Sequence, residues 1–244
     1  MEGNFVFPSM KPRISPTAAA APVLLLVLAG CGRPADRREG PALQSSESVE
    51  LGNTESTHAV IRMSAGELHV RGGSAKLLEA DFSYTLPGGK PRVEYRATGS
   101  RARLNIEQPG GMRGGGSWDL RFNDTQPLEL ETHFGAGEVK LDLSSVTLRS
   151  LEINMGVGEL DLDLRGKPKR DYDVRVHGGV GEATIRLPKD VGIKAEARGG
   201  IGEIEMRGLE KRGNRWVNPG HEDADATIHL SVAGGVGAIR VLAE

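Results

Sequence analysis

The chain has 244 residues, with 31 Lys and Arg residues against 33 Asp and Glu residues, one cysteine and 34 glycines. The near-neutral charge argues against a nucleic-acid-binding protein, which would show a net basic surface. The single cysteine excludes an internal disulfide framework and a cysteine-built zinc site, and the glycine content indicates either disorder or many backbone positions that do not tolerate a Cβ.

An apolar run of 13 residues, 18–30, follows Lys11 and Arg13. A basic stretch followed by an apolar run of this length is typical of a secretory signal peptide, whereas a membrane-spanning helix needs about 20 apolar residues. We therefore predict that residues 1–30 are a signal peptide. Translation is expected to start at Met10, because MKPRISPT begins such a peptide more conventionally than the segment before it.

The apolar run ends in a tetrapeptide that resembles the lipobox of bacterial lipoproteins, Leu28-Ala29-Gly30-Cys31. In that motif the cysteine takes a diacylglycerol, and further acylation, for example with palmitate, makes the anchor stable. We expect Cys31 to anchor the chain on an envelope membrane that it does not span. In a bacterium with two membranes this is the outer membrane or a periplasm-facing surface, and with one membrane it is the extracellular face. Residues 31–57 consist of the cysteine expected to be lipidated and a polar segment rich in Pro, Gly and Ser, which we expect to form a flexible tether.

An internal repeat follows the tether. Five segments carry Gly-x-Gly, and Ser64-Ala65-Gly66 is a degenerate sixth copy. The second glycines, which we expect at structural corners, are Gly66, Gly137, Gly158, Gly181, Gly202 and Gly237. From Gly137 on, they are separated by 21, 23, 21 and 35 residues. A dinucleotide-binding fingerprint is excluded, because it needs a third glycine three residues later and a helix that it opens.

Apolar residues alternate with polar ones on both sides of each corner, but the phase shifts by one residue at the glycine. One copy places apolar residues before and after its corner as follows: Leu151, Ile153, Met155 and Val157, then Leu160, Leu162 and Leu164. A period of two predicts strands, and the repeated shift predicts a turn or bulge that keeps both apolar sets inside. Val180, Ile201 and Val236 correspond to Val157, and all four are expected to face inward.

Each unit of 21–23 residues therefore forms two short strands joined at a corner, and stacked units bury a continuous core. We predict an all-β protein in which residues 58–244 form a single-domain β-solenoid of about seven coils; a β-sandwich is the alternative. An insertion at 210–225 is expected to form a hairpin whose Trp216 covers the edge of the core. The strand ending at Glu244 is expected to leave an open edge, which a second copy could pair with to form a homodimer.

Residues 58–244 resemble the toast-rack family of bacterial envelope domains, which occurs in lipoproteins and in proteins related to the LiaF-like cell-wall-active-antibiotic response. The residues that carry the resemblance are Phe82-Ser83-Tyr84, Val93-Glu94-Tyr95, Asn105-Ile106-Glu107-Gln108-Pro109, Trp118-Asp119-Leu120, Leu128-Glu129-Leu130, the corner at Gly135, Arg215-Trp216-Val217-Asn218-Pro219-Gly220 and Gly234-Gly235-Val236-Gly237. The resemblance implies a stacked-strand fold and an envelope location, and it brings no catalytic residues. A more distant similarity is to adhesin solenoids with glycine-rich repeats.

A glutamate follows most of the corner glycines. In-register stacking would align four of them at about 4.8 Å spacing, namely Glu138, Glu159, Glu182 and Glu203. Such a row either caps the corners as solvated carboxylates or attracts cations, Ca²⁺ among them, and both interpretations stay open. His133 and His177 are expected on the surface two coils apart, too far apart to share one metal ion. We expect no resident cofactor or metal.

The residues contain no nucleophile–base motif of the common hydrolases. A polysaccharide-cleaving β-helix would need one particular acid–base pair, whereas these carboxylates repeat identically from coil to coil. The sequence favours a non-enzymatic, lipid-anchored envelope protein that binds an envelope protein or a glycan and is tied to envelope stress signalling. An adhesin-like surface lipoprotein is the alternative, and a polysaccharide-active enzyme is favoured less.

Overall fold

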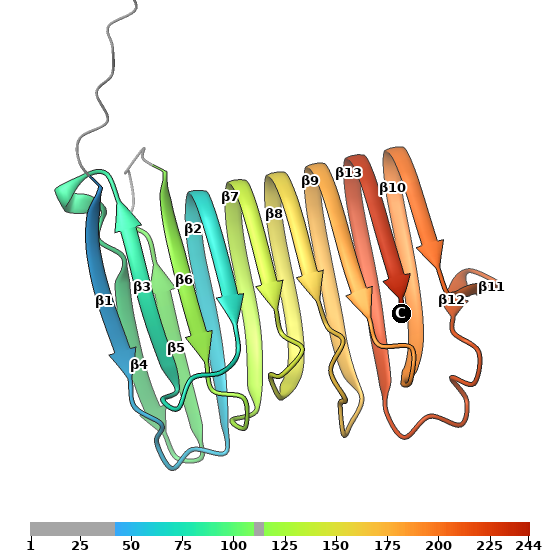
Figure 1. The fold of residues 1–244 in the computed structure, drawn as a ribbon, viewed down its shortest axis with the longest axis horizontal. Coiled ribbons are helices and arrows are strands. Elements are labelled where there is room, and N and C mark those ends of the chain that lie inside the picture. The colour runs from blue at the N-terminus through green and yellow to red at the C-terminus, as the bar shows by residue number, and fades with distance from the viewer. Residues whose placement is uncertain (1–41, 110–114) are drawn as a thin grey trace, which may run out of the picture. The chain divides into compact units, whose positions relative to one another are not determined.

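The computed structural model describes residues 42–109 and 115–244. Within these ranges the regular structure is β-strand, apart from the short 3-10 helix η1 (Pro87–Gly89), and one sheet joins all 13 strands. Figure 1 shows strands that wind as successive coils and stack side by side. The predicted all-β solenoid is therefore confirmed, and the β-sandwich alternative is not observed.

Six long strands, each of 15 to 17 residues, form most of the coils: β2 (Ser56–Arg71), β7 (Leu128–Asp142), β8 (Leu148–Asp163), β9 (Tyr172–Leu187), β10 (Gly192–Arg207) and β13 (Thr227–Ala243). Each bends at its corner glycine, and we call the parts before and after this residue the first and second arm. The long strands pair in parallel with the corner glycines in register. Identical repeats therefore place equivalent residues in rows along the stack.

A further coil is assembled from two separate strands. β5 (Arg101–Glu107) pairs in parallel with the first arm of β2, and β6 (Gly116–Phe122) pairs in parallel with its second arm. Together with the six long strands, this gives the described part of the chain the expected seven or so coils. Between β5 and β6, residues 110–114 lie outside the described ranges.

The coils do not stack in chain order. β13, the last strand of the chain, lies between β9 and β10 and pairs with both of them. The expectation of an open edge at the C-terminal strand is therefore wrong, and the second arm of β10 forms the free edge at this end. The insertion between β10 and β13 allows this exchange, because it leads the chain back across the end of the stack.

The insertion contains the predicted hairpin. β11 (Glu210–Arg212) and β12 (Arg215–Val217) pair in an antiparallel manner, and β12 pairs with the first arm of β10. Trp216 is partly buried and packs against the core at the position of Ala195. Asn218 fastens the hairpin: its side-chain oxygen accepts the backbone N–H of Ile193 at 2.8 Å, and its amide donates to the carbonyl oxygen of Val191 at 2.6 Å.

Antiparallel strands close the other end of the stack. β3 (Leu78–Tyr84) pairs with β6, β1 (Leu43–Val49) pairs with β3, and β4 (Arg92–Thr98) pairs with β5. The prediction of a flexible tether over 31–57 is therefore wrong from β1 onward. β1 has the polar sequence LQSSESV, and its side chains are exposed or half-buried, so a search for apolar alternation misses it. Backbone pairing with β3 holds this edge strand in place instead.

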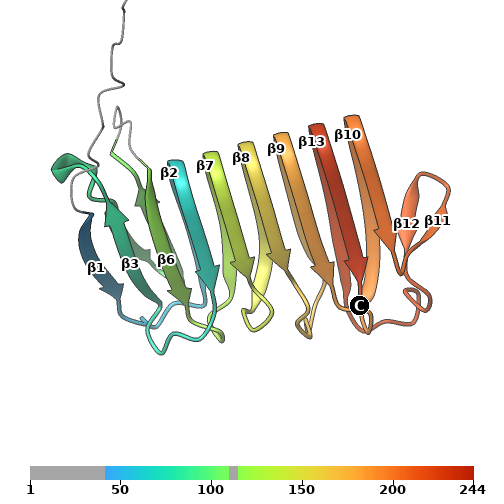
Figure 2. The ribbon, with the colours of Figure 1, turned by 45° about the horizontal axis from the view of Figure 1, so that its top comes forward.

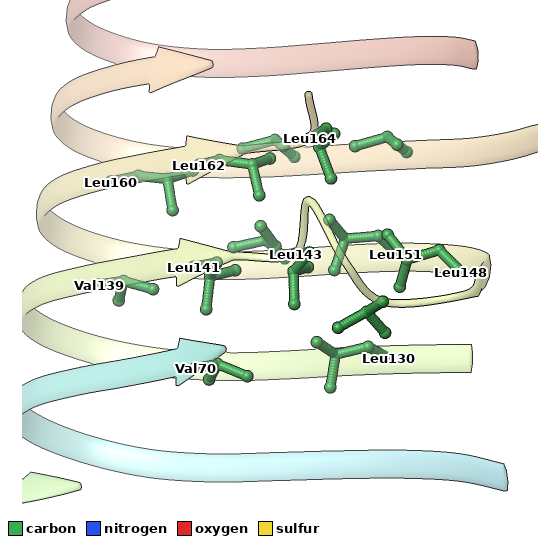
Figure 3. Close-up of a cluster of buried hydrophobic side chains, with 14 of the residues drawn as sticks. Val70, Leu130, Val139, Leu141, Leu143, Leu148, Leu151, Leu160, Leu162 and Leu164 are labelled. Carbon is green, nitrogen blue, oxygen red and sulfur yellow. The ribbon is translucent and has the colours of Figure 1, made fainter. Parts of the chain in front are cut away.

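The core lies between the first and second arms of the coils. Figure 3 shows rows of leucines from successive coils packed on one another, and Leu141, Leu151 and Leu162 are at most 1% exposed. Each such side chain contributes roughly 1.5–3 kcal/mol by leaving water. Burial continues on both sides of the corner, from Ile153 before it to Leu160 after it, so the phase shift predicted at the glycine is confirmed.

The residues between the two glycines of each corner differ from the prediction. Val157, Val180, Val236 and Ile201 are 52%, 48%, 46% and 73% exposed, so the expectation that they face inward is wrong. The backbone reverses direction at this point, and the outside of the bend is a convex edge. A side chain placed there therefore points away from the space between the arms.

Candidate functional site

The corner edge is the most regular feature of the surface. All six predicted corner glycines have positive φ, from +127° at Gly137 to +144° at Gly181. A side chain at this φ is strained, and a Cβ on Gly158 would also overlap the backbone carbonyl oxygen of Gly137 in the neighbouring coil. Equivalent overlaps occur along the row, so the corners stack closely only because they lack side chains.

The first glycine of each Gly-x-Gly also contributes to this stacking, a role that the sequence prediction did not assign. A Cβ on Gly156 would overlap the carbonyl oxygen of Gly135, and a Cβ on Gly179 would overlap that of Gly156. These glycines do not have positive φ, so the requirement comes from interstrand contact rather than from backbone conformation. Their repetition together with the second glycines was the sequence signal that could have identified them.

The glutamate row follows the spatial order of the coils rather than the chain order. Glu67, Glu138, Glu159 and Glu182 are consecutive neighbours, whereas Ala238 separates Glu182 from Glu203. The expected run of four therefore loses Glu203 and gains Glu67. Because β13 lies between β9 and β10 and carries Ala238 at this position, an alanine separates Glu203 from the other glutamates.

Basic side chains compensate part of the glutamate row. Lys140 Nζ lies 2.6 Å from Glu138 Oε1, and Arg240 Nη1 lies 2.9 Å from Glu182 Oε2. The hydrogen bond and the charge of Lys140 hold the pKa of Glu138 below its usual value. Among residues 42–109 and 115–244, no group of three or more His, Cys, Asp or Glu side chains could hold a metal ion.

A second row of side chains lines a groove on the outer face of the first arms, next to the corners. Arg62, His133, Asn154 and His177 are consecutive neighbours across β2, β7, β8 and β9. The groove has a volume of about 720 Å³, and Gly135, Gly156 and Gly179 contribute to its lining. Asn154 lies between the two histidines, which are two coils apart as expected.

Acidic side chains orient part of this row. His133 Nε2 lies 2.5 Å from Glu131 Oε1, and Asn154 donates a hydrogen bond of 3.1 Å to Glu152. The hydrogen bond from His133, with the nearby charges of His133 and His58, lowers the pKa of Glu131. The groove thus presents imidazole, amide and guanidinium groups above bare glycine backbone. Chemically, this surface can form hydrogen bonds with a ligand that lies along the stack.

A small apolar cavity lies inside the corners of the last three coils. At the inward position just before the corner, Phe134 and Met155 of β7 and β8 are replaced by Gly178, Gly234 and Gly199 in β9, β13 and β10. The cavity has a volume of about 40 Å³. Ile239 and Ile204 side chains approach Gly234 and Gly199, whereas a Cβ on Gly178 would meet no heavy atom within 4 Å.

Three aromatic side chains of the kind that can stack on a sugar ring are buried or partly buried. Trp118 is 2% exposed and packs edge-to-face against Phe82, with 5.3 Å between ring centroids. Trp216 and Tyr84 are partly buried against the core. Trp118 therefore serves the core rather than a glycan surface.

The predicted lipidation site Cys31 and the lipobox residues Leu28, Ala29 and Gly30 lie outside the described residues. In residues 42–109 and 115–244, no helix is long and apolar enough to cross a membrane. The lipid anchor at Cys31 thus stays a prediction from the sequence.

Two family models match the chain. Residues 38–186 match the N-terminal domain of toast_rack, and residues 136–241 match the C-terminal domain described as cell wall-active antibiotics response LiaF. Both matches lie largely within the described solenoid, and the resemblance noted from the sequence is confirmed. No curated protein matches the chain.

A solved structure shares the fold. A “putative cell adhesion protein” from Clostridium sporogenes is 31% identical, with a TM-score of 0.80, over 83% of this chain and 100% of the other. A “putative adhesin” from Bacteroides fragilis is 10% identical, with a TM-score of 0.32, over 82% of this chain and 96% of the other. The Clostridium structure and this chain thus share one architecture along nearly the whole described part.

Proposed function

Because the chain belongs to the toast-rack family, we propose that it is a non-enzymatic, lipid-anchored protein of the bacterial cell envelope that binds another envelope component. The observation that carries this proposal is the polar groove formed by Arg62, His133, Asn154 and His177 beside the corner edge. It offers hydrogen-bonding groups at regular intervals on a rigid stack of strands. Such a surface suits recognition of an extended protein segment or a glycan strand.

Two observations from the relatives suggest what this binding serves. The match of residues 136–241 to the LiaF-like C-terminal domain supports a role tied to the response to cell-wall-active antibiotics. The similarity to the cell adhesion protein from Clostridium sporogenes supports an adhesive role as the second candidate. The groove geometry fits both, so the two candidates are separated by experiment.

The groove is tested in a strain that lacks the gene. We expect the strain to show an altered stress-reporter response to a cell-wall-active antibiotic, and the wild-type gene to restore it. His177→Ala should restore less, whereas His229→Ala, a half-buried histidine outside the groove lining, should restore the response fully. An unchanged reporter together with lost attachment to surfaces would support the adhesive role, and full activity of His177→Ala in both assays would contradict the proposed binding surface.

Anchoring is tested separately. The mass of the protein isolated from envelope membranes should correspond to a chain that begins at Cys31 and carries acyl groups. Cys31→Ser should abolish this acylation and move the protein out of the membrane fraction. A membrane-bound Cys31→Ser protein would contradict lipid anchoring at this residue.

A further inference from the structure

The exposed apolar residues of the described chain gather at one edge. Eight large apolar side chains are exposed, and seven of them lie at the corner edge: Leu43, Leu86, Val157, Val180, Ile201, Ile204 and Val236. The exception is Leu51, which follows the far end of β1. Solvent exposure of single apolar residues is ordinary, but their collection along one edge indicates a contact surface.

Four of these residues form a continuous row that we call the corner ridge: Val157, Val180, Val236 and Ile201. They are successive neighbours in β8, β9, β13 and β10, and their exposed fractions range from 46% to 73%. Glycines precede and follow each of them, so no neighbouring side chain on the same strand covers the ridge. The ridge is therefore a convex, narrow apolar surface.

The opposite edge of the coils has a different character. It carries the turns between strands, for example residues 164–171 between β8 and β9, where Lys167, Lys169 and Arg170 are exposed. Figure 2 shows the bends of the long strands along one edge and these turns along the other. The apolar residues thus gather at the corner edge, whereas the turn edge carries exposed charged side chains such as these.

The described chain begins at the apolar edge. Leu43 pairs with Tyr84, Tyr84 pairs with Gly116, and the Gly116 backbone lies against the corner at Gly66. The start of β1 therefore lies at the same edge as the ridge, as Figures 1 and 2 also show. Cys31 precedes Leu43 by 12 residues, a length of chain that spans at most about 40 Å. An anchor at Cys31 would therefore be joined to the solenoid at the corner edge rather than at the turn edge.

We infer that the corner ridge rests on the surface of the lipid bilayer and orients the anchored solenoid. The apolar interior of the bilayer would shield the exposed side chains of the ridge from water, and its broad surface can contact the whole row. The ridge enters the bilayer only to a shallow depth, because only the tips of the valine and isoleucine side chains project beyond the backbone. This inference rests on the anchoring proposed above, and the experiment below keeps the two apart.

The glutamate row sets the lipid preference of this contact. Glu159, Glu182 and Glu203 lie two residues beyond ridge positions and are exposed. Arg240 compensates Glu182, but no salt bridge of the described residues involves Glu159 or Glu203. Anionic lipids would repel these carboxylates, and salt would screen the repulsion. Contact should therefore be stronger on zwitterionic bilayers than on anionic ones.

The test uses a chain that starts at Cys31, the first residue of the mature protein proposed above. Its only thiol, Cys31, is coupled to maleimide lipids in phosphatidylcholine vesicles, so the anchor is present whether or not cells acylate this cysteine. Val180→Trp places a reporter on the ridge, and Lys167→Trp places one at the turn edge. Lipids brominated near the top of their acyl chains quench a tryptophan that reaches them.

We expect quenching beyond that of the parent tryptophans for Val180→Trp and none for Lys167→Trp. Val157→Trp serves as a second ridge reporter if the first variant misfolds. Phosphatidylglycerol in the vesicles should reduce the quenching, and added salt should restore part of it. Absence of quenching at both ridge positions, or equal quenching at residue 167, would overturn the inference.

A second copy of the chain is the competing occupant of the ridge. Sedimentation of the uncoupled protein measures this, with Val180→Glu as the variant that disrupts a ridge contact. A dimer that Val180→Glu dissociates, together with an unquenched ridge, would overturn the bilayer inference and assign the ridge to self-association. Failed acylation in cells, with quenching preserved in the coupled vesicles, would contradict the proposed anchor and leave the ridge contact standing.

Discussion

Adding one methyl group at a corner should destabilise the stack, and Gly158→Ala is the sharpest form of this test. Gly158 has a φ of +138°, and a Cβ there would overlap the Gly137 carbonyl oxygen and lie 2.8 Å from its carbonyl carbon. Backbone strain of this kind costs about 1–3 kcal/mol, and overpacking costs about as much again. We expect the free energy of unfolding to fall by about 2–6 kcal/mol, a large share of the usual 5–15 kcal/mol of a domain.

Gly178→Ala is the matched control. Gly178 is also a glycine near a corner, but its φ is not positive, and a Cβ would meet no heavy atom within 4 Å. Alanine there restricts the unfolded chain and occupies part of the apolar cavity, so the expected change is a gain of about 0.4–1 kcal/mol. Denaturant unfolding, followed by the fluorescence of the buried Trp118, measures both variants. A Gly158→Ala protein as stable as the parent, or a Gly178→Ala protein destabilised as strongly, would refute the close-stacking argument.

Three further predictions concern the groove, the insertion and the core. Glu131→Gln should destabilise the protein at neutral pH, because the His133 hydrogen bond lowers the pKa of Glu131 in the folded state. The loss of stability should shrink as the pH falls from the ordinary glutamate pKa through the lowered one. Unfolding measured at several pH values tests this, and a stability difference that stays constant with pH would contradict it. Asn218→Ala should cost about 1–3 kcal/mol of unfolding free energy, because buried backbone groups lose their partner, and a neutral result would disprove this anchoring of the hairpin. Leu162→Ala should cost about 2–5 kcal/mol, since its side chain is fully buried, whereas Val157→Ala should be nearly neutral in denaturant unfolding; similar losses would contradict the exposed ridge.

The sequence predicted the repeating unit with good detail. The period-two pattern around Gly158 identified two strands and a bend, because alternation reports which face of a strand is buried. The shift in phase at the glycine identified the corner, and the structure places Gly158 at positive φ. The resemblance to the toast-rack family, carried by scattered residues such as Trp118, pointed to the same stacked fold.

Three features were not readable from the pattern. β1 is an edge strand held by backbone pairing, so its polar side chains gave no apolar signal. Val157 continues the alternation but points outward, because alternation does not reveal where the bend turns the backbone over. The groove places Arg62 beside His133 only through interstrand register, which joins residues 71 positions apart.

The sequence by itself determined the coil. The alternation of apolar residues and the need for glycine at the corner both depend on contacts within one repeat and with its immediate neighbour. Tertiary structure alone decided the order of the coils. The long strands offer nearly equivalent edges, so local pattern cannot choose among partners, and the path of the insertion places β13 between β9 and β10. That choice moved Ala238 into the glutamate row and left the second arm of β10 as the free edge.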